Sequence, residues 1–188
     1  MKIGIDPGHG YSNKKQGVYD PGAGGKAAGG NWEADIVLLW ALELEAACKR
    51  SGILTWMSRD DRTDPDPLST RDNRAAAAGC NLFLSIHTNA GVAAANGTET
   101  FYRDDPDRRW AKIVHAATIA ALGLRDRGIK TEEQTHAGRL AVLAFAPPAC
   151  LVELGFITNT KDRVVMLDAG PRRAWADRVS ASVRALAP

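Results

Sequence analysis

Short apolar runs alternate with amphipathic segments along the whole chain, and this alternation indicates the fold class. The apolar runs predict strands over residues 2–6, 53–59, 82–89, 97–103, 140–143 and 150–156. The amphipathic segments predict helices over residues 32–51, 69–78, 107–123, 161–167 and 171–187. Strands that alternate with helices in this way are typical of an α/β domain.

Three of the apolar runs, at residues 3–5, 82–86 and 151–154, are too continuously apolar for a sheet with one face in water. They fit parallel strands that are covered on both sides. We therefore expect a three-layer α/β fold, with a mostly parallel, twisted central sheet of about six strands and helices on both faces. The longest predicted loop is the glycine-rich segment 11–31.

The composition fits one globular domain over residues 1–188, since a chain of this length buries roughly 70% of its unfolded surface. The formal net charge of +2 gives no electrostatic argument for a nucleic-acid partner. No apolar run reaches the roughly 18 residues that a membrane span needs. The three cysteines are odd in number and widely separated, which argues against a disulfide framework or a zinc ribbon and predicts buried thiols.

Two histidines occupy equivalent places at the ends of predicted strands. His9 follows the first strand, and His87 ends the apolar run 82–86. Ligands of open α/β sheets bind beyond the carboxyl ends of parallel strands, so the two imidazoles can meet there. Either histidine alone would more often be structural, but the pair indicates a site.

Two carboxylates lie where apolar side chains are expected. With Asn31 as the helix cap, Glu33 lies in the first turn on the apolar face, where an unpaired carboxylate is costly. A divalent cation is one partner for it, and the helix dipole is the alternative. Glu153 lies inside the apolar sequence Leu-Val-Glu-Leu, where burial raises its pKa and suits it to acid–base catalysis. The alternative is a structural ion pair with an arginine such as Arg71.

His9, Glu33 and His87 together supply three ligands, which leaves a tetrahedral zinc ion with one open position. That arrangement is typical of hydrolytic zinc sites, whereas structural sites are closed by four protein ligands. Water in the open position becomes acidic and serves as the nucleophile. The spacing excludes an H-E-x-x-H helix, so the ligands must come from separate elements.

The other polar segments carry weaker signals. No G-x-S-x-G motif is present, and the charged runs 59–62 and 103–109 are predicted to be solvated loops. His136 lies in the polar segment 131–138, which is either a plain loop or the lining of a substrate groove.

Five motifs occur in order along the chain. They are Asp-Pro-Gly-His-Gly at 6–10, Asp-Pro-Gly-Ala at 20–23, Glu33 at the start of a helix, Ser-Ile-His-Thr-Asn-Ala at 85–90 and Leu-Val-Glu-Leu-Gly-Phe at 151–156. Together they resemble the zinc-dependent N-acetylmuramoyl-L-alanine amidases, the catalytic domains of bacterial autolysins and phage endolysins. Each motif alone is modest evidence, but five in sequence over nearly the whole chain are specific.

This resemblance implies one zinc ion per chain, bound by His9, Glu33 and His87, with Glu153 as the catalytic acid/base. It also implies hydrolysis of the amide between the lactyl group of N-acetylmuramic acid and L-Ala of the peptidoglycan stem peptide. Two alternatives stay open: a zinc peptidase that cuts within the stem peptide, and a catalytically silent cell-wall-binding domain.

The two ends of the chain bear on where such an enzyme acts. We expect no signal peptide before the first strand and no separate cell-wall-binding domain after the last helix. We therefore expect synthesis in the bacterial cytoplasm with endolysin-like release onto the wall, or a domain excised from a secreted autolysin. We expect a monomer that binds the glycan-peptide substrate, with no nucleic-acid partner and no membrane span.

Overall fold

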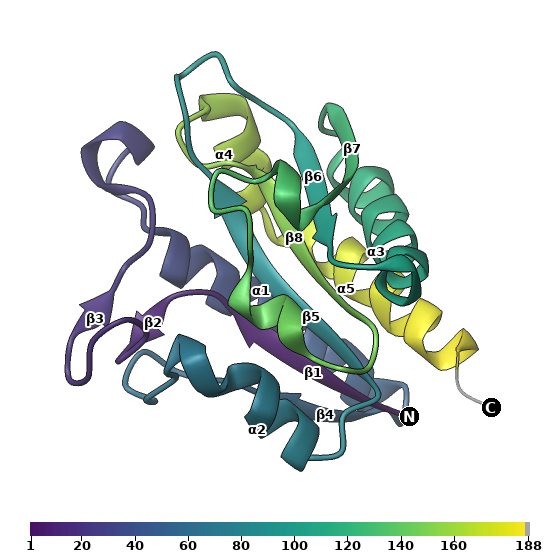
Figure 1. The fold of residues 1–188 in the computed structure, drawn as a ribbon. Helices are drawn as coiled ribbons and strands as arrows, with labels where there is room; N and C mark the ends of the chain where they lie inside the picture. The colour runs from purple at the N-terminus through teal and green to yellow at the C-terminus, as the bar shows by residue number, and fades with distance from the viewer. Residues whose placement is uncertain (187–188) are drawn as a thin grey trace.

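The computed structural model describes residues 1–186 and shows a six-stranded sheet between two layers of helices (Figure 1). In spatial order the strands are β4 (Leu54–Met57), β1 (Lys2–Pro7), β5 (Leu82–Asn89), β8 (Ala149–Phe156), β6 (Thr98–Tyr102) and β7 (Asp126–Thr131). The first four are parallel, whereas β6 pairs antiparallel with β8 and parallel with β7. The predicted α/β fold with a mostly parallel sheet is confirmed.

Helices cover both faces of this sheet, as predicted. They are α1 (Glu33–Arg50), α2 (Arg71–Ala77), α3 (Asp105–Leu122), α4 (Thr160–Leu167) and α5 (Ala169–Ala185). The long helices α1, α3 and α5 pack on one face, around Trp40 and Trp175, whose ring centroids lie 5.3 Å apart. The short helix α2 and the 3₁₀ turn η4 (Ala141–Ala144) cover the other face, around Phe83 and Leu143.

The predicted loop 11–31 contains short elements of its own. Strands β2 (Gly10–Tyr11) and β3 (Tyr19–Asp20) form a small antiparallel hairpin, and the 3₁₀ turn η1 (Gly25–Ala28) follows it. This hairpin lies beside the carboxyl end of β1 (Figure 1). Two more 3₁₀ turns, η2 (Leu68–Thr70) and η3 (Glu132–Gln134), precede α2 and follow β7. The segment 11–31 is therefore part of the ordered wall around the end of β1.

The sixth strand is not the one predicted. Residues 140–143 fall in and beside η4, where Val142 and Leu143 are buried, because a short apolar run suits a buried turn as well as a strand. The prediction missed β7, which is an edge strand paired only with β6 and carries the sequence Asp-Arg-Gly-Ile-Lys-Thr. An edge strand with exposed charges lacks the apolar signature of a buried one.

The last helix starts earlier than predicted. α5 begins at Ala169 rather than residue 171, because the Asp168 side chain caps it by accepting a hydrogen bond from Gly170 N at 2.8 Å. The predicted end of this helix, at Ala187, lies outside the described residues.

The three cysteines, Cys48, Cys80 and Cys150, are free and buried, which confirms the prediction of core thiols. Burial raises the pKa of the Cys48 thiol to about 11. Among residues 1–186, none of the helices combines the length and the apolar character needed to cross a membrane.

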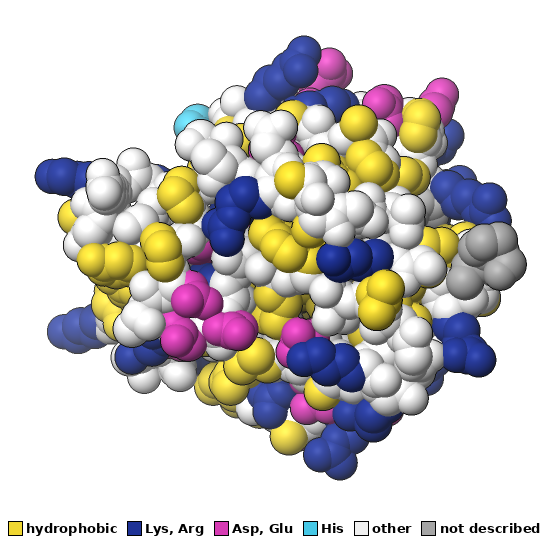
Figure 2. All heavy atoms as spheres, turned by 90° about the horizontal axis from the view of Figure 1, so that it is seen from below, with side chains coloured by type: hydrophobic (Ala, Val, Ile, Leu, Met, Phe, Trp, Pro, Cys, Tyr) yellow, Lys and Arg dark blue, Asp and Glu magenta, His cyan; other side chains and the backbone are white. Residues whose placement is uncertain are grey.

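Figure 2 shows the molecule from below, on the side of α2 and β4. Lys and Arg side chains are scattered over this face, between acidic and apolar side chains. On the edge strand β4, Leu54 is 66% exposed. The mixed charge of this face agrees with the nearly balanced composition of the chain.

Candidate metal centre and active site

His9 lies directly beyond the carboxyl end of β1, in a turn with an unusual backbone. Its φ is 63°, a left-handed conformation that is costly for a residue with a side chain. Gly8 has no room for a side chain, because a Cβ there would lie 2.3 Å from Cε1 of His87. The turn therefore brings the two imidazoles together, with ring centroids 5.0 Å apart.

Glu33 lies between the two histidines. It is the first residue of α1 and is buried, whereas His87 lies on β5. Glu33 Oε2 is 3.0 Å from His9 Nε2, and Glu33 Oε1 is 3.0 Å from His87 Nδ1. The structure thus brings together the three predicted ligands from three separate elements.

Backbone amides hold the Glu33 carboxylate in place. Ala23 N donates to its Oε2 and Thr88 N donates to its Oε1, both at 2.9 Å. The prediction that Asn31 caps this helix is wrong, because α1 begins without a side-chain cap and Asn31 Nδ2 donates to a backbone carbonyl instead. The carboxylate is therefore oriented from the loop on one side and from β5 on the other.

Asp20 supports His9 from the side away from Glu33. His9 Nδ1 lies 3.2 Å from Asp20 Oδ2, and Asn13 Nδ2 donates to the same oxygen at 2.7 Å. Gly22 N donates to Asp20 Oδ1 at 3.0 Å. A carboxylate on the second ring nitrogen is a usual partner of a metal-binding histidine. The sequence motif at 20–23 includes Asp20, but the motif alone predicts no role for this residue.

The donor set fits a zinc ion. One ligand atom each from His9, Glu33 and His87 lies within 4.8 Å of the others. Ligands about 2.1 Å from a tetrahedral zinc ion stand about 3.4 Å apart, and the histidine nitrogens lie 3.0 Å from the two oxygens of Glu33. Imidazole nitrogens and a carboxylate oxygen are common zinc ligands, so these residues could hold one ion.

The surroundings keep Glu33 ionised. Burial alone would raise its pKa, but the hydrogen bonds and positive charge of His87 and His9 hold the pKa of Glu33 well below its usual range. For His9, burial lowers the pKa, but hydrogen bonds to Glu33 and Asp20 outweigh burial and raise it. An ionised carboxylate is the form that a metal ligand requires.

Glu153 lies next to His87 on the neighbouring strand. The two residues are directly paired in the parallel register of β5 and β8. Glu153 Oε2 is buried and has no hydrogen-bond partner among residues 1–186. Burial, and then the negative charges of Glu33 and Glu99, raise the pKa of Glu153 well above its usual range. Such a carboxyl group is available to take up and release a proton.

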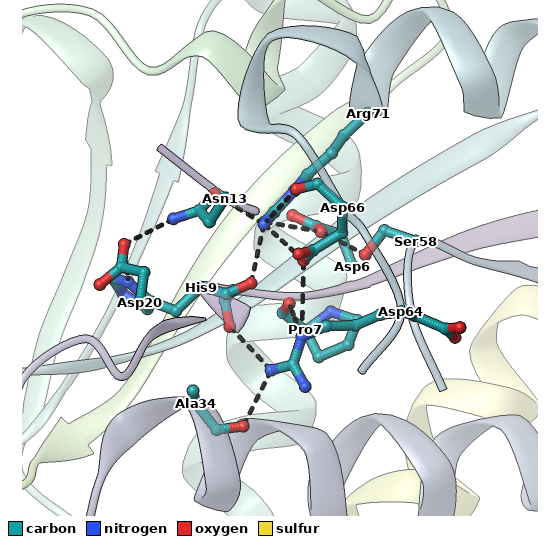
Figure 3. A network of polar contacts seen from close by, with 12 residues as sticks. Asp6, Pro7, His9, Asn13, Asp20, Ala34, Ser58, Asp64, Asp66 and Arg71 are labelled. Carbon is teal, nitrogen blue, oxygen red and sulfur yellow. Dashed lines mark hydrogen bonds and ion pairs between the residues drawn. The ribbon is translucent and has the colours of Figure 1, made fainter. Parts of the chain in front are cut away.

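Arg71 joins three segments beside the turn that carries His9 (Figure 3). It is the first residue of α2, and its side chain is buried. Its Nη1 donates to Asp6 Oδ1 at 3.0 Å, and its Nη2 donates to Asp66 Oδ2 at 2.6 Å and to the His9 carbonyl at 2.8 Å. The alternative in which Arg71 pairs with Glu153 is therefore wrong.

Arg59 binds the backbone of the same turn. Its Nη2 donates to the carbonyls of Gly8 at 2.9 Å and Ala34 at 2.8 Å, and its Nε donates to the Pro7 carbonyl at 3.2 Å. The prediction of a solvated loop over residues 59–62 is wrong at Arg59, which is 1% exposed. Its bonds fix the turn before His9 against the start of α1.

A cleft of about 380 Å³ opens beside Glu153. His136 lines it, so the segment 131–138 forms part of a groove, which was one of its two predicted roles. His115, in contrast, is buried in α3 and makes a hydrogen bond with Thr100 at 3.0 Å. The four predicted site residues and His136 therefore lie at one end of the sheet.

Comparison with known families matches residues 3–185 to N-acetylmuramoyl-L-alanine amidase. The uncharacterized protein YqiI of Bacillus subtilis (strain 168) is 37% identical over 158 residues, which cover 77% of this chain and 72% of YqiI. The N-acetylmuramoyl-L-alanine amidase LytC of the same strain is 37% identical over 165 residues. That alignment covers 85% of this chain but 30% of LytC, so the chain spans less than a third of that relative.

A solved structure supports the same assignment. The catalytic domain of CwlV, an N-acetylmuramoyl-L-alanine amidase from Bacillus (Paenibacillus) polymyxa var. colistinus, matches with a TM-score of 0.85 and 29% identity. The match covers 98% of this chain and 97% of that domain. The sequence motifs, the fold and the family match agree, and this chain belongs to the N-acetylmuramoyl-L-alanine amidase family.

Proposed function

We propose that this chain is a zinc-dependent hydrolase that cleaves the amide between the lactyl group of N-acetylmuramic acid and L-Ala of the peptidoglycan stem peptide. The observation that carries the proposal is the meeting of His9 and His87 on the two oxygens of Glu33, next to the unpaired carboxyl of Glu153. The family match supports this reaction and does not favour a peptidase or a silent wall-binding domain.

His9, Glu33 and His87 are the residues that would hold the metal. Zinc bound there supplies Lewis-acid chemistry, which acidifies water and polarises a carbonyl group. Glu33 stays ionised between the two histidines, and Asp20 fixes the ring of His9 so that Nε2 faces Glu33. The ligands are therefore oriented by the protein before any metal binds.

Glu153 is the proposed acid/base. Its carboxyl takes a proton from the attacking water and delivers it to the departing amine of L-Ala. Both transfers require a carboxyl whose pKa lies near the working pH, and burial beside Glu33 shifts the pKa of Glu153 in that direction. The paired register with His87 keeps this group next to the ligand cluster.

Mass spectrometry of purified peptidoglycan after digestion tests the reaction. We expect intact stem peptides with a new L-Ala amino terminus, and no release after treatment with a chelator. Glu153→Gln should lower the rate by roughly 10²–10⁴-fold, because it removes the acid/base group. Elemental analysis of that variant should still find one zinc ion per chain.

The matched control is Glu43→Gln, which changes a partly buried glutamate on α1 that lies 3.9 Å from Arg173. It should alter neither turnover nor metal content. Cleavage within the stem peptide would indicate a peptidase, and wall binding without release of amines would indicate a silent domain. Either result contradicts the proposal.

The setting of this activity also remains a proposal. Relatives named as cell wall amidases support peptidoglycan as the substrate. The single-domain organisation, the monomeric state and synthesis in the cytoplasm followed by endolysin-like release stay predictions, as does the alternative of a domain from a secreted autolysin.

A further inference from the structure

The cleft beside Glu153 has a wall of charged side chains that the proposed reaction does not use. Its lining includes Glu99 on β6 and Arg127 and Lys130 on β7. Lys130 lies on the strand next to Glu99, and both basic side chains are about a quarter exposed, at 28% for Arg127 and 27% for Lys130. These two cations therefore face the space that a substrate enters.

The charges in this wall do not balance. Arg127 Nε donates to Glu99 Oε2 at 2.9 Å, and Lys130 Nζ donates to the same oxygen. Asn89 Nδ2 occupies the other oxygen of Glu99 at 2.7 Å. Burial alone would raise the pKa of Glu99, but the hydrogen bonds from Lys130 and Arg127 lower it, so this carboxylate is ionised. Two positive charges thus share one negative charge.

Both cations also keep hydrogen-bond donors that no described residue accepts. Arg127 uses only its Nε within residues 1–186, and its guanidinium lies over the Phe156 ring at 4.9 Å. Its two terminal nitrogens and the remaining N–H groups of Lys130 are therefore available. Planar donors with a net positive charge are suited to a carboxylate.

The distance between Glu153 and the two cations indicates which carboxylate of the stem peptide can reach them. Glu99 lies directly opposite Glu153 in the antiparallel register of β6 and β8. Neighbouring strands are about 4.8 Å apart, and Arg127 and Lys130 both bond Glu99 Oε2, so their charged groups lie beside the strand next to Glu153. Two extended peptide residues, L-Ala and the one after it, together span about 7 Å. The residue after L-Ala therefore reaches this wall when the scissile amide lies at Glu153.

We propose that Arg127 and Lys130 bind the free α-carboxylate of the second stem-peptide residue, D-Glu, and that the chain discriminates against stems in which this group is an amide. The inference rests on the proposed function, because that function places L-Ala at Glu153. A carboxamide carries no charge and presents its own donors to the two cations, so it loses the charge-assisted bonds.

Calorimetry with two synthetic ligands tests the subsite without any turnover. The ligands are N-acetylmuramoyl-L-Ala-D-Glu and the same molecule with the α-carboxylate as an amide, and the protein is the zinc-loaded Glu153→Gln variant. We expect the acid to bind about tenfold to hundredfold more tightly than the amide. Equal affinities for the two ligands would overturn the proposal.

Substitutions of the two basic residues in the cleft wall test whether they cause the preference for the acid over the amide. Lys130→Met in the same background should reduce the ratio of acid to amide affinity to about threefold or less, and Arg127→Gln provides a second test if the first variant is unstable. Lys112→Met is the matched control, because Lys112 is an exposed lysine on α3 outside the cleft lining. A ratio that both wall variants leave unchanged would overturn the assignment.

Hydrolysis of longer stems separates this proposal from the proposed function. If the wild-type chain cleaves acid and amide stems at equal rates, the subsite is wrong and the function stands. If it cleaves neither stem but the binding preference is found and lost in the wall variants, the function is wrong and the subsite stands. If the affinity or rate changes with amidation of the third stem-peptide residue and not of the second, the assignment to the α-carboxylate of D-Glu is wrong.

Discussion

On the β1 side of the candidate metal centre, buried arginines bind the backbone of the turn that carries His9. On the β8 side, Glu153 has an oxygen with no hydrogen-bond partner in the described part of the chain. The turn is bound at three successive carbonyls by Arg59 and Arg71. Glu153 is surrounded instead by an open cleft and by other carboxylates.

This difference fits the two roles proposed for these regions, holding ligand atoms in place and transferring a proton. A buried network with many charge-assisted hydrogen bonds holds its members in one arrangement, which suits residues that must present ligand atoms at fixed positions, even though Asp66 Oδ1 in this network has no partner among residues 1–186. A buried polar atom without a partner costs about 1–3 kcal/mol, and such groups persist where chemistry uses them. In the proposed mechanism, the residues that would hold the metal are thus preorganised, and Glu153 is left free to exchange a proton with water and substrate.

Arg71→Met should have the largest effect on the ligand side. It removes the cation from the buried Asp6, whereas Asp66 keeps Arg59 at 3.5 Å, and the unpaired Asp6 should cost about 3–5 kcal/mol in the free energy of unfolding. Urea unfolding measures this. Arg74→Met is the control, since Arg74 is an exposed arginine on the same helix and should cost below about 1 kcal/mol. Equal losses for the two variants would contradict the comparison.

Asp20→Asn should have a smaller effect, confined to the metal. It keeps the shape of the side chain but removes the negative charge beside His9 Nδ1, which should weaken zinc binding by about 10–100-fold. Competition with a chromogenic chelator measures the affinity. Asp35→Asn, which loses a surface ion pair with Arg62, should leave zinc affinity unchanged. A normal affinity for Asp20→Asn would show that His9 is oriented without this carboxylate.

The smallest effect is expected for Asp6, whose contribution to the free energy of unfolding is lost at acidic pH. Burial alone would raise the pKa of Asp6, but Arg71 and the hydrogen bonds from Ser85 and Ser58 lower it. Its contribution to stability is therefore full above the unfolded pKa of about 3.9 and is lost as the pH falls below that value, by up to about 1.4 kcal/mol per pH unit.

Urea unfolding between pH 5 and pH 3 tests this prediction. Asp6→Asn should flatten the profile below about pH 4, even though the variant is less stable at neutral pH. Asp105→Asn, at an exposed position in the first turn of α3, should keep the wild-type slope. Parallel acid profiles for all three proteins would show that the network under His9 does not titrate through Asp6.

The buried strands could be predicted because their apolar runs are continuous, as in Leu82–Asn89 and Ala149–Phe156. The edge strand Asp126–Thr131 could not, since its pairing with β6 is made by backbone groups and leaves no apolar pattern in the sequence. The run at residues 140–143 was misassigned because burial, rather than strand geometry, explains its apolar side chains.

The site residues could be predicted where a polar residue interrupts an apolar context, as Glu33 and Glu153 do. The residues that support them could not. Arg59 lies in a charged run that reads as a solvated loop, and so does Asp107, which is 4% exposed and accepts a hydrogen bond from Ala149 N. Whether such a charged side chain is buried depends on partners that are distant in the sequence. The residues next to it in the sequence do not predict those partners.

The three free thiols have a practical consequence for this domain. Burial raises the pKa of each, so reactive thiolates are scarce, and no sulfur–sulfur bond helps to hold the layers together. The stability of the fold therefore does not vary through reduction or formation of a disulfide within the chain.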